Sequence, residues 1–423
     1  MSPDHHITIA LVSVENIYKA KVLLKGVADP TPLMHNVNLS DHYACQIWLK
    51  REDLQVVRSY KIRGAYNKMA GLSPEQLSRG VICASAGNHA QGVAFACRKM
   101  KVHGIIYMPS VTPKQKIKKV QLFGKEFVEV RLRGDTFDEA NTEAMRIAGE
   151  ENRTFVHPFD DERVIEGQGT VGLEILESCK DPIDYVFVAV GGGGLISGLG
   201  SYFEQISPDT KIIGVEPSGA AALHAALEAG KVVTLDKIDN FVDGAAVQRI
   251  GEITFPIIQK VMDDLVLVPE GKVCSTILQL YNEEGIVVEP AGALTIAALD
   301  QYADKIRGKN VVCVLSGSNN DITRTEEIKE RSLLYEGLKH YFIIRFPQRA
   351  GALRDFLNHV LGPTDDITHF EYTKKHNRET GPALVGIQVE HRSDFDALVQ
   401  RMEEYHFSYQ PLNNSKMLFD LLI

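Results

Sequence analysis

The most informative absences in this 423-residue chain concern cysteine pairing and metal ligands. Its six cysteines never form a C-x-x-C motif, and none of its 14 histidines lies in an H-E-x-x-H motif or in Cys/His zinc spacing. Cys83 and Cys313 lie within apolar runs that are typical of buried strands. These absences argue against a disulfide framework and a zinc site. We expect a reduced, cytoplasmic protein without a metal ion.

The chain also lacks a long hydrophobic run and a concentration of positive charge. Residues 7–14 form an apolar run that is too short to span a bilayer, lacks a preceding basic region and meets Glu15 without a small-residue cleavage pattern. The formal net charge is -9 at pH 7, and basic residues are scattered except in the lysine-rich segment 114–119. We expect neither a membrane nor a nucleic acid as partner, and we interpret segment 114–119 as a solvated helix face.

Hydrophobic residues make up 44% of the chain, which is enough to bury a large core. A chain of this length is expected to divide into domains. Within residues 45–322, short β-branched runs alternate with segments of helical period. The candidate strands are 81–84, 104–108, 127–132, 185–190, 211–215 and 311–315, and the candidate helices include 90–100, 136–147 and 170–178. This alternation predicts an α/β fold with mostly parallel sheets covered by helices on both faces. Ligands of such sheets bind beyond the carboxyl ends of the strands.

A different pattern begins near residues 331–335. A strand candidate (340–346), a helix (352–360), two β-rich segments (367–374 and 383–390) and a helix (395–405) follow in order. This βαββα order predicts a small α+β domain. We therefore divide the chain into residues 1–330, with two α/β subdomains, and residues 335–423.

The turn S-Y-K-I-R-G-A (59–65) places Lys61 beside an aromatic residue and at the head of a helical run. Burial and the positive end of a helix would lower the pKa of its amine and leave a usable nucleophile. A single lysine is more often simply solvated. The spacing alone leaves both interpretations open.

The turn A-S-A-G-N-H-A (84–90) connects a candidate strand to a candidate helix. Its small residues let the backbone approach a ligand, and the N–H groups at the start of the helix could bind a carboxylate. The alternative is an ordinary turn in which Asn88 caps the helix.

Two further turns follow candidate strands. The run G-G-G-G-L-I-S-G (191–198) is costly in backbone entropy, which favours a role such as wrapping a phosphate with amides. It is neither a P-loop nor a dinucleotide fingerprint, so a compact phosphate is favoured over ATP or NAD. In L-S-G-S-N-N (315–320), Ser316 offers a hydroxyl, although a serine there more commonly shapes the turn. An amine, a carboxylate site, a phosphate site and a hydroxyl together meet the needs of pyridoxal phosphate.

With E-P-A-G-A (289–293), these motifs stand in an order that resembles the tryptophan-synthase-like (fold type II) family of pyridoxal-phosphate enzymes, specifically threonine dehydratases, or threonine ammonia-lyases. The segments F-P-Q-R-A-G-A-L-R (346–354) and L-G-P-T-D-D-I-T-H-F-E-Y-T-K-K (361–375) resemble the single ACT-like regulatory domain of the short biosynthetic form. The resemblance implies a catalytic region in residues 1–330 and a regulatory domain in residues 335–423.

The resemblance also implies roles for individual residues. Lys61 would hold the cofactor covalently and later take a proton from the substrate, and Ser316 would face the pyridine nitrogen. Asn88 would bind the phenolic oxygen of the ring. The phosphate would be bound by Gly191, Gly192, Gly193, Gly194 and Leu195. The substrate carboxylate would be bound by Ser85, Ala86, Gly87, Asn88 and His89.

Two positions depart from the family pattern. Tyr60 stands where the family commonly has Phe, which could add a polar contact and leaves the role of Lys61 intact. Ala222 stands where related serine racemases place an acid in a cation-binding stretch. We expect no divalent metal there.

The function that the resemblance implies is deamination of L-threonine to 2-oxobutanoate and ammonia, the first step of isoleucine biosynthesis. Isoleucine, or valine, would act on the regulatory domain, and the chain would form a homo-oligomer, a dimer or a tetramer. One alternative is a serine/threonine dehydratase of broad or catabolic role. An alternative of another class is a non-catalytic amino-acid sensor.

Overall fold

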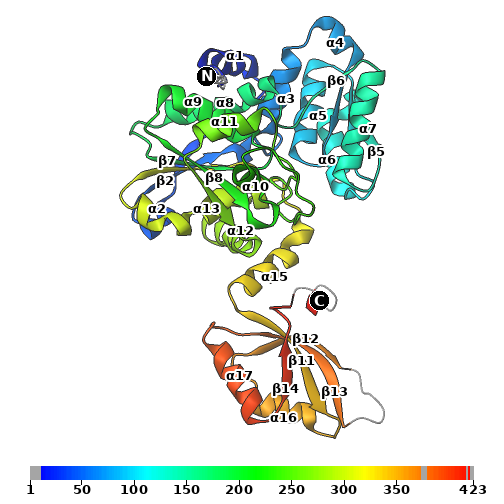
Figure 1. Cartoon of the computed structure of the whole chain (residues 1–423), viewed down its shortest axis with the longest axis vertical. Coiled ribbons are helices and arrows are strands. Elements are labelled where there is room, and N and C mark those ends of the chain that lie inside the picture. Colours follow the sequence, from blue (N-terminus) through cyan, green and yellow to red (C-terminus); the bar gives the residue numbers. More distant parts are fainter. Residues whose placement is uncertain (1–10, 373–378, 416–417, 420–423) are drawn as a thin grey trace, which may run out of the picture. The chain divides into compact units, whose positions relative to one another are not determined.

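The computed structural model describes residues 11–372, 379–415 and 418–419. Its internal contacts divide the chain into two units, Met1–Asp321 and Ile322–Ile423 (Figure 1). The second unit opens with a 3-10 turn, η5 (Ile322–Arg324), and helix α15 (Thr325–Tyr335). Helix α15 runs through residues 331–335, where the sequence pattern changes.

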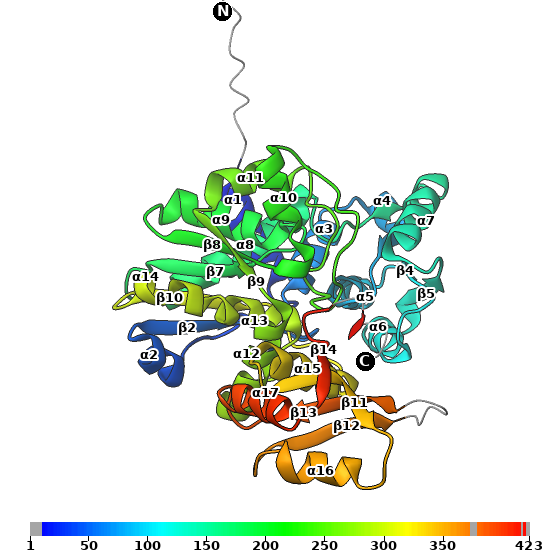
Figure 2. The same ribbon diagram turned by 60° about the horizontal axis from the view of Figure 1, so that its bottom comes forward.

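The larger sheet of the first unit has the strand order β1-β2-β10-β7-β8-β9. Its strands are β1 (Leu33–His35), β2 (Gln46–Arg51), β7 (Tyr185–Ala189), β8 (Lys211–Pro217), β9 (Asp264–Val268) and β10 (Asn310–Leu315). Every neighbouring pair is parallel except β1 and β2. Helices α8 and α9 cover one face and α12 and α13 the other (Figure 2). Strands buried on both faces explain the continuous apolar runs in β7 and β10.

The smaller sheet of this unit has the order β5-β4-β3-β6, with all neighbours parallel. Its strands are β3 (Val81–Ala84), β4 (Gly104–Met108), β5 (Val128–Leu132) and β6 (Thr154–Phe155). Helices α5 and α6 pack on one face and α7 on the other. Two mostly parallel sheets with helices on both faces confirm the predicted α/β fold.

The helices of the first unit connect and cover these strands. They are α1 (Val14–Leu24), α2 (Val37–Tyr43), α3 (Lys61–Ala70), α4 (Pro74–Arg79), α5 (Asn88–Met100), α6 (Lys114–Gly124), α7 (Phe137–Glu150), α8 (Glu162–Ser178), α9 (Gly194–Ile206), α10 (Ala222–Ala229), α11 (Thr254–Val261), α12 (Glu270–Glu284), α13 (Pro290–Ala297) and α14 (Ala303–Ile306).

Helix α8 begins well before residue 170, where the sequence predicted its start. Glycines in its first half concealed the helical period. A Cβ at Gly167 would lie 2.6 Å from the carbonyl oxygen of Arg63 on α3, and one at Gly198 on α9 would lie 2.3 Å from the carbonyl oxygen of Ile165. The glycines therefore allow α8 to pack backbone to backbone against α3 and α9.

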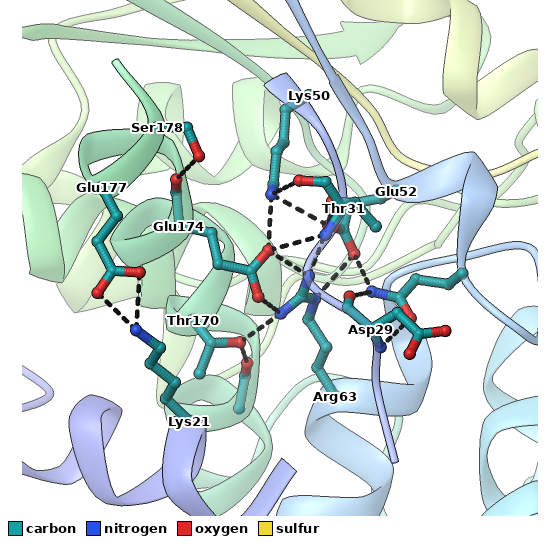
Figure 3. Close-up of polar contacts among 12 residues, drawn as sticks. Lys21, Asp29, Thr31, Lys50, Glu52, Arg63, Thr170, Glu174, Glu177 and Ser178 are labelled. Carbon is teal, nitrogen blue, oxygen red and sulfur yellow. Dashed lines mark hydrogen bonds and ion pairs between the residues drawn. The ribbon is translucent and has the colours of Figure 1, made fainter. Parts of the chain in front are cut away.

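A buried cluster of charges also fixes α3 against α8 (Figure 3). Arg63 of α3 lies between Glu52, in the 3-10 turn η1 (Glu52–Leu54), and Glu174 of α8, and Lys50 of β2 also pairs with Glu174. Two positive and two negative side chains balance in this cluster. It joins β2, η1, α3 and α8 beside the residue that begins α3, Lys61.

The second unit contains an antiparallel sheet with the order β12-β13-β11-β14. Its elements are β11 (Lys339–Pro347), α16 (Ala352–His359), β12 (Asp366–Tyr372), β13 (Thr380–Gln388), α17 (Asp394–Glu404) and β14 (Ser408–Pro411). Both helices pack on one face of the sheet, around a core that includes Phe342, Phe356 and Leu398. The α+β class is confirmed, and residues 373–374 of the predicted strand lie outside the described residues.

One strand of this unit was missed. Strand β14 pairs with β11 at the edge of the sheet, so the order is βαββαβ and not βαββα. It is four residues long and mostly exposed, and it includes Gln410 and Pro411. Such a segment carries no apolar alternation, and only its pairing with β11 makes it a strand.

Candidate active site

Turns from both sheets of the first unit meet at one pocket. Four residues singled out from the sequence line it: Lys61, Asn88, Gly191 and Ser316. Strand β10 lies between β2 and β7, and all three run in parallel, so the turns at their carboxyl ends are neighbours. The amide of Tyr60, before α3, donates to the carbonyl oxygen of Ser316 at 3.2 Å. Asn88 enters the same pocket from the turn after β3.

Lys61 is the first residue of α3. Its Nζ donates to the carbonyl oxygen of Pro158 at 2.9 Å. Loss of surrounding water lowers the pKa of this amine to about 8, and the negative charge of Glu289 partly opposes the shift. Most of the amine is still protonated near pH 7, but its neutral fraction is far larger than that of an ordinary lysine, which favours a role as a nucleophile or a base.

Asn88 is the first residue of α5, and Gly87 stands at the cap position without a side-chain hydrogen bond. The interpretation of Asn88 as the helix cap is therefore wrong. Its Nδ2 instead donates to Oε1 of Glu289 at 2.6 Å, and its Oδ1 accepts from Nδ2 of Asn319 at 2.7 Å. The Asn88 side chain is held in the wall of the pocket.

The glycine run turns sharply from β7 into α9. Gly193 has φ +91°, a conformation that disfavours any side chain, and a Cβ at Gly192 would lie 2.2 Å from the ring of Phe159. The carbonyl oxygen of Gly192 accepts a hydrogen bond from Oγ1 of Thr254 at 2.7 Å. The first amides of α9 have no acceptor within the helix. The turn therefore has the form of an anion site, and Gly191 lines the pocket.

The other members of the predicted carboxylate site do not line this pocket. Ser85, Ala86 and Gly87 are half-buried in the turn before α5, where Gly87 N donates to Oγ of Ser85 at 3.2 Å. His89 is buried, and its Nε2 pairs with the carbonyl oxygen of Val156 at 2.8 Å. Desolvation and the charge of Lys61 lower the pKa of His89 to about 3, so its ring is neutral.

Glu289, which received no role from the sequence, is buried and lines the pocket. It immediately precedes Pro290, the first residue of α13. Desolvation, followed by the charge of Asp243, raises the pKa of Glu289 to about 7. A signal was available, because an acid within the apolar stretch I-V-V-E-P-A-G-A is expensive to bury without a partner. The pocket is completed by Tyr60, Ala189, Gly244, Ala245 and Ala291.

Two other kinds of site are absent from the described residues. No group of three or more His, Cys, Asp or Glu side chains in that part of the chain is arranged to hold a metal ion. No helix among residues 11–372, 379–415 and 418–419 is long and apolar enough to cross a membrane. Ala222 begins helix α10.

Comparison with known proteins connects this pocket to a family. The sequence pattern of the family described as "Pyridoxal-phosphate dependent enzyme" matches residues 24–317. The chain belongs to this family. Residues 330–422 match a second pattern, described as "C-terminal regulatory domain of Threonine dehydratase".

Similar proteins cover nearly the whole chain or about three quarters of it. The chain is 58% identical over 414 residues to a biosynthetic L-threonine dehydratase of Bacillus subtilis, covering 98% of each chain. The solved structure of processed threonine deaminase isoform 2 from Solanum lycopersicum is 41% identical, with a TM-score of 0.71, over 78% of this chain and 98% of that one. A serine racemase structure from Dictyostelium discoideum is 30% identical, with a TM-score of 0.68, over 74% and 100%.

The pocket has the chemistry that pyridoxal phosphate needs. It combines an amine of lowered pKa at Lys61, a hydroxyl at Ser316 and an amide side chain at Asn88 with a glycine turn in which neighbouring side chains leave no room for a Cβ at residues 192 and 193. The glycine turn precedes a 13-residue helix, whose positive end favours a phosphate. The residues present therefore fit the cofactor that defines the family.

Proposed function

We propose that this chain deaminates L-threonine to 2-oxobutanoate and ammonia, using pyridoxal phosphate. The observation that carries the proposal is the convergence of Lys61, Asn88, Gly191 and Ser316 on one pocket at the carboxyl ends of parallel strands. Similarity to a biosynthetic L-threonine dehydratase over 98% of the chain supports threonine as the substrate.

Each predicted residue receives a role in this proposal. Lys61 binds the cofactor covalently, Asn88 donates to the phenolic oxygen, and Ser316 faces the ring nitrogen. Gly191, Gly192, Gly193, Gly194 and Leu195 bind the phosphate through their amides. The turn Ser85, Ala86, Gly87, Asn88 and His89, of which Asn88 alone lines the pocket, would bind the substrate carboxylate through backbone amides at the start of α5.

When bound, pyridoxal phosphate accepts the electron pair that remains when the α-carbon of an amino acid loses a proton. The amine of Lys61, freed when the amino group of the substrate takes its place on the cofactor, would take that proton, and its pKa of about 8 suits a group that must both accept and release a proton. The β-hydroxyl then leaves as water with a returned proton. Released aminocrotonate hydrolyses to 2-oxobutanoate and ammonia. Ser316, a neutral hydroxyl, does not force a proton onto the ring nitrogen, which favours elimination over transamination.

The second unit supports a proposal of feedback control. We propose that residues 335–423, following a catalytic region of residues 1–330, bind isoleucine or valine. Gly351, with φ +85°, stands at the start of α16, where a free amino acid could place its carboxylate on the helix amides. We further propose that the enzyme is cytoplasmic and forms a homo-oligomer, a dimer or a tetramer.

One experiment tests the main proposal. Threonine is added to the purified holoenzyme, and 2-oxobutanoate formation is followed with and without isoleucine. We expect turnover of threonine that isoleucine inhibits. Equal rates on L-serine without an isoleucine effect would instead indicate a catabolic serine/threonine dehydratase. Purified protein without the visible absorbance of the cofactor would favour the non-catalytic sensor.

A further inference from the structure

Asn88, Glu289 and Asn319 form a closed ring of hydrogen bonds beside the pocket, made by their side chains and one backbone N–H. Asn88 Nδ2 donates to Glu289 Oε1 at 2.6 Å, and Asn319 Nδ2 donates to Asn88 Oδ1 at 2.7 Å. The backbone N–H of Asn319 closes the ring by donating to Glu289 Oε2 at 3.2 Å. Asn88 comes from the smaller sheet, and the other two residues come from turns beside the larger sheet.

The direction of every hydrogen bond in this ring is fixed by groups that cannot reverse. Asn319 Nδ2 also donates to the carbonyl oxygen of Val57 at 2.9 Å, and a carbonyl only accepts. Asn319 Oδ1 accepts from Nζ of Lys119 at 3.4 Å, and an ammonium only donates. The Asn319 amide is therefore held in one orientation, from both ends.

The orientation of Asn319 determines that of Asn88. A reversed Asn88 amide would point its NH₂ group at the NH₂ group of Asn319 and its oxygen at the carboxylate of Glu289. The contact with Asn319 would be mismatched in either protonation state of Glu289, and the contact with Glu289 would be mismatched whenever that carboxyl is ionised. In a largely buried site an unpaired polar group destabilises strongly. The Asn88 nitrogen carries two hydrogens, and Glu289 accepts one of them.

We propose that Asn319 and Glu289 are positioning residues that hold the Asn88 amide in the orientation that presents an N–H donor, and not an oxygen, to the pocket. The inference rests on the proposed function, because the group that meets this donor is the phenolic oxygen of pyridoxal phosphate. A fixed donor favours the ionised form of that oxygen. Lys119, from the lysine-rich segment that the sequence argument left without a function, anchors the ring from outside.

The decisive variant is Asn319→Asp, which keeps the shape of the side chain and removes its NH₂ group. The oxygens of the new carboxylate would face Asn88 Oδ1, so the Asn88 amide should reverse and present oxygen to the cofactor. We expect the dissociation constant of pyridoxal phosphate from apoenzyme to rise on the order of tenfold or more. The absorbance of the bound cofactor should shift toward the form with a protonated ring oxygen.

Asn320→Asp is the matched control. It adds the same charge one residue along the turn, where Asn320 Oδ1 accepts only from the neighbouring backbone of Asp321 among the hydrogen bonds described. We expect a wild-type cofactor spectrum and affinity for this variant. Asn319→Asp should melt at a lower temperature than Asn320→Asp, because its carboxylate cannot donate to the Val57 carbonyl. Spectra and affinities are therefore compared at a temperature at which the apo forms of both variants are folded.

Glu289→Gln supplies a second test, also if Asn319→Asp fails to fold. The introduced glutamine side chain can accept from Asn88 with its oxygen only if its NH₂ group faces the backbone N–H of Asn319, where two donors meet. The orientation of Asn88 is then less firmly held. We therefore expect an absorbance shift in the same direction as that of Asn319→Asp, but smaller. Wild-type spectra in both variants, or in Glu289→Gln when it is the only one that folds, would overturn the inference. If wild-type protein binds no pyridoxal phosphate, the proposed function itself fails, which is a separate outcome.

Discussion

Arg63 and Glu174 are joined by two hydrogen bonds, of 2.6 and 2.8 Å, with side chains only 1% and 8% exposed. Arg63 also donates to both oxygens of Glu52 at 2.8 Å, and Lys50 pairs with Glu174 at 2.6 Å (Figure 3). Four buried charges remain balanced only while all four are present. Because Arg63 follows Lys61 by two residues on α3, the same contacts fix the helix that carries the reactive amine.

Replacing Arg63 with Met should leave the carboxylates of Glu52 and Glu174 in excess in a dry site. We expect a loss of about 3–5 kcal/mol in the free energy of unfolding, measured by urea denaturation. Arg79→Met is the control, because Arg79 pairs with Glu75 at the surface and should lose less than about 1 kcal/mol. Similar losses in the two variants would contradict a special role for the buried cluster.

The variant Lys61→Ala should fold and have no measurable turnover, because it removes the amine that binds the cofactor and moves the proton. Borohydride reduction of the wild-type holoenzyme followed by peptide mapping should find the cofactor on Lys61. Lys68→Ala, on the same helix, removes a lysine paired with Asp161 and should keep activity. A labelled peptide that contains another lysine would refute the assignment.

A side chain at Gly193 should weaken retention of the cofactor more than it changes the chemistry of bound cofactor. The residue has φ +91°, and a Cβ would lie 2.6 Å from Ile258 Cδ1 and 2.8 Å from Thr254 Oγ1. We expect Gly193→Ala, and more strongly Gly193→Val, to lose pyridoxal phosphate on dialysis. Gly149→Ala is the control, since a Cβ there meets nothing within 4 Å. Full cofactor content in Gly193→Val would argue against the phosphate site.

The lowered pKa of Lys61 should make the apoenzyme more stable as pH rises. Its folded value is about 8, below the ordinary lysine value of 10.5, so the unfolded chain binds more protons between those two pH values. Stability therefore rises through that window. The free energy of unfolding of apoenzyme minus that of Lys61→Met should increase from pH 8 to 10. A flat difference would show that the amine has an ordinary pKa.

Isoleucine should bind to the second unit and reduce threonine saturation. Linkage then requires threonine, or a non-reacting analogue, to weaken isoleucine binding by the same factor. Calorimetry on the intact protein measures both directions. Truncation after Arg331 should leave a cofactor-bound unit without the response, with its oligomeric state measured in parallel. No heat of binding and no change in threonine saturation would reject feedback control.

Local signals in the sequence were enough to predict the α/β class and to single out Lys61, Asn88, Gly191 and Ser316, which line the pocket. Runs of apolar, β-branched residues form strands β3, β4 and β10, which are almost wholly buried. The first and last residues of these strands were predicted to within one residue. The run of glycines after β7 favours a tight turn whatever the rest of the fold, and the structure has one between β7 and α9. The order of the motifs then indicated the family, which the comparisons confirm.

Features that depend on partners distant in the sequence were decided by the tertiary structure alone. Asn88 meets Glu289 across 201 residues, and Arg63 meets Glu174 across 111, so neither pairing has a local signature. The same holds for β14, a strand only because β11 lies beside it. Hydrogen-bond direction and charge balance arise when the chain brings donors and acceptors together in a site without water. The sequence supplies the groups, and packing determines which of them face each other.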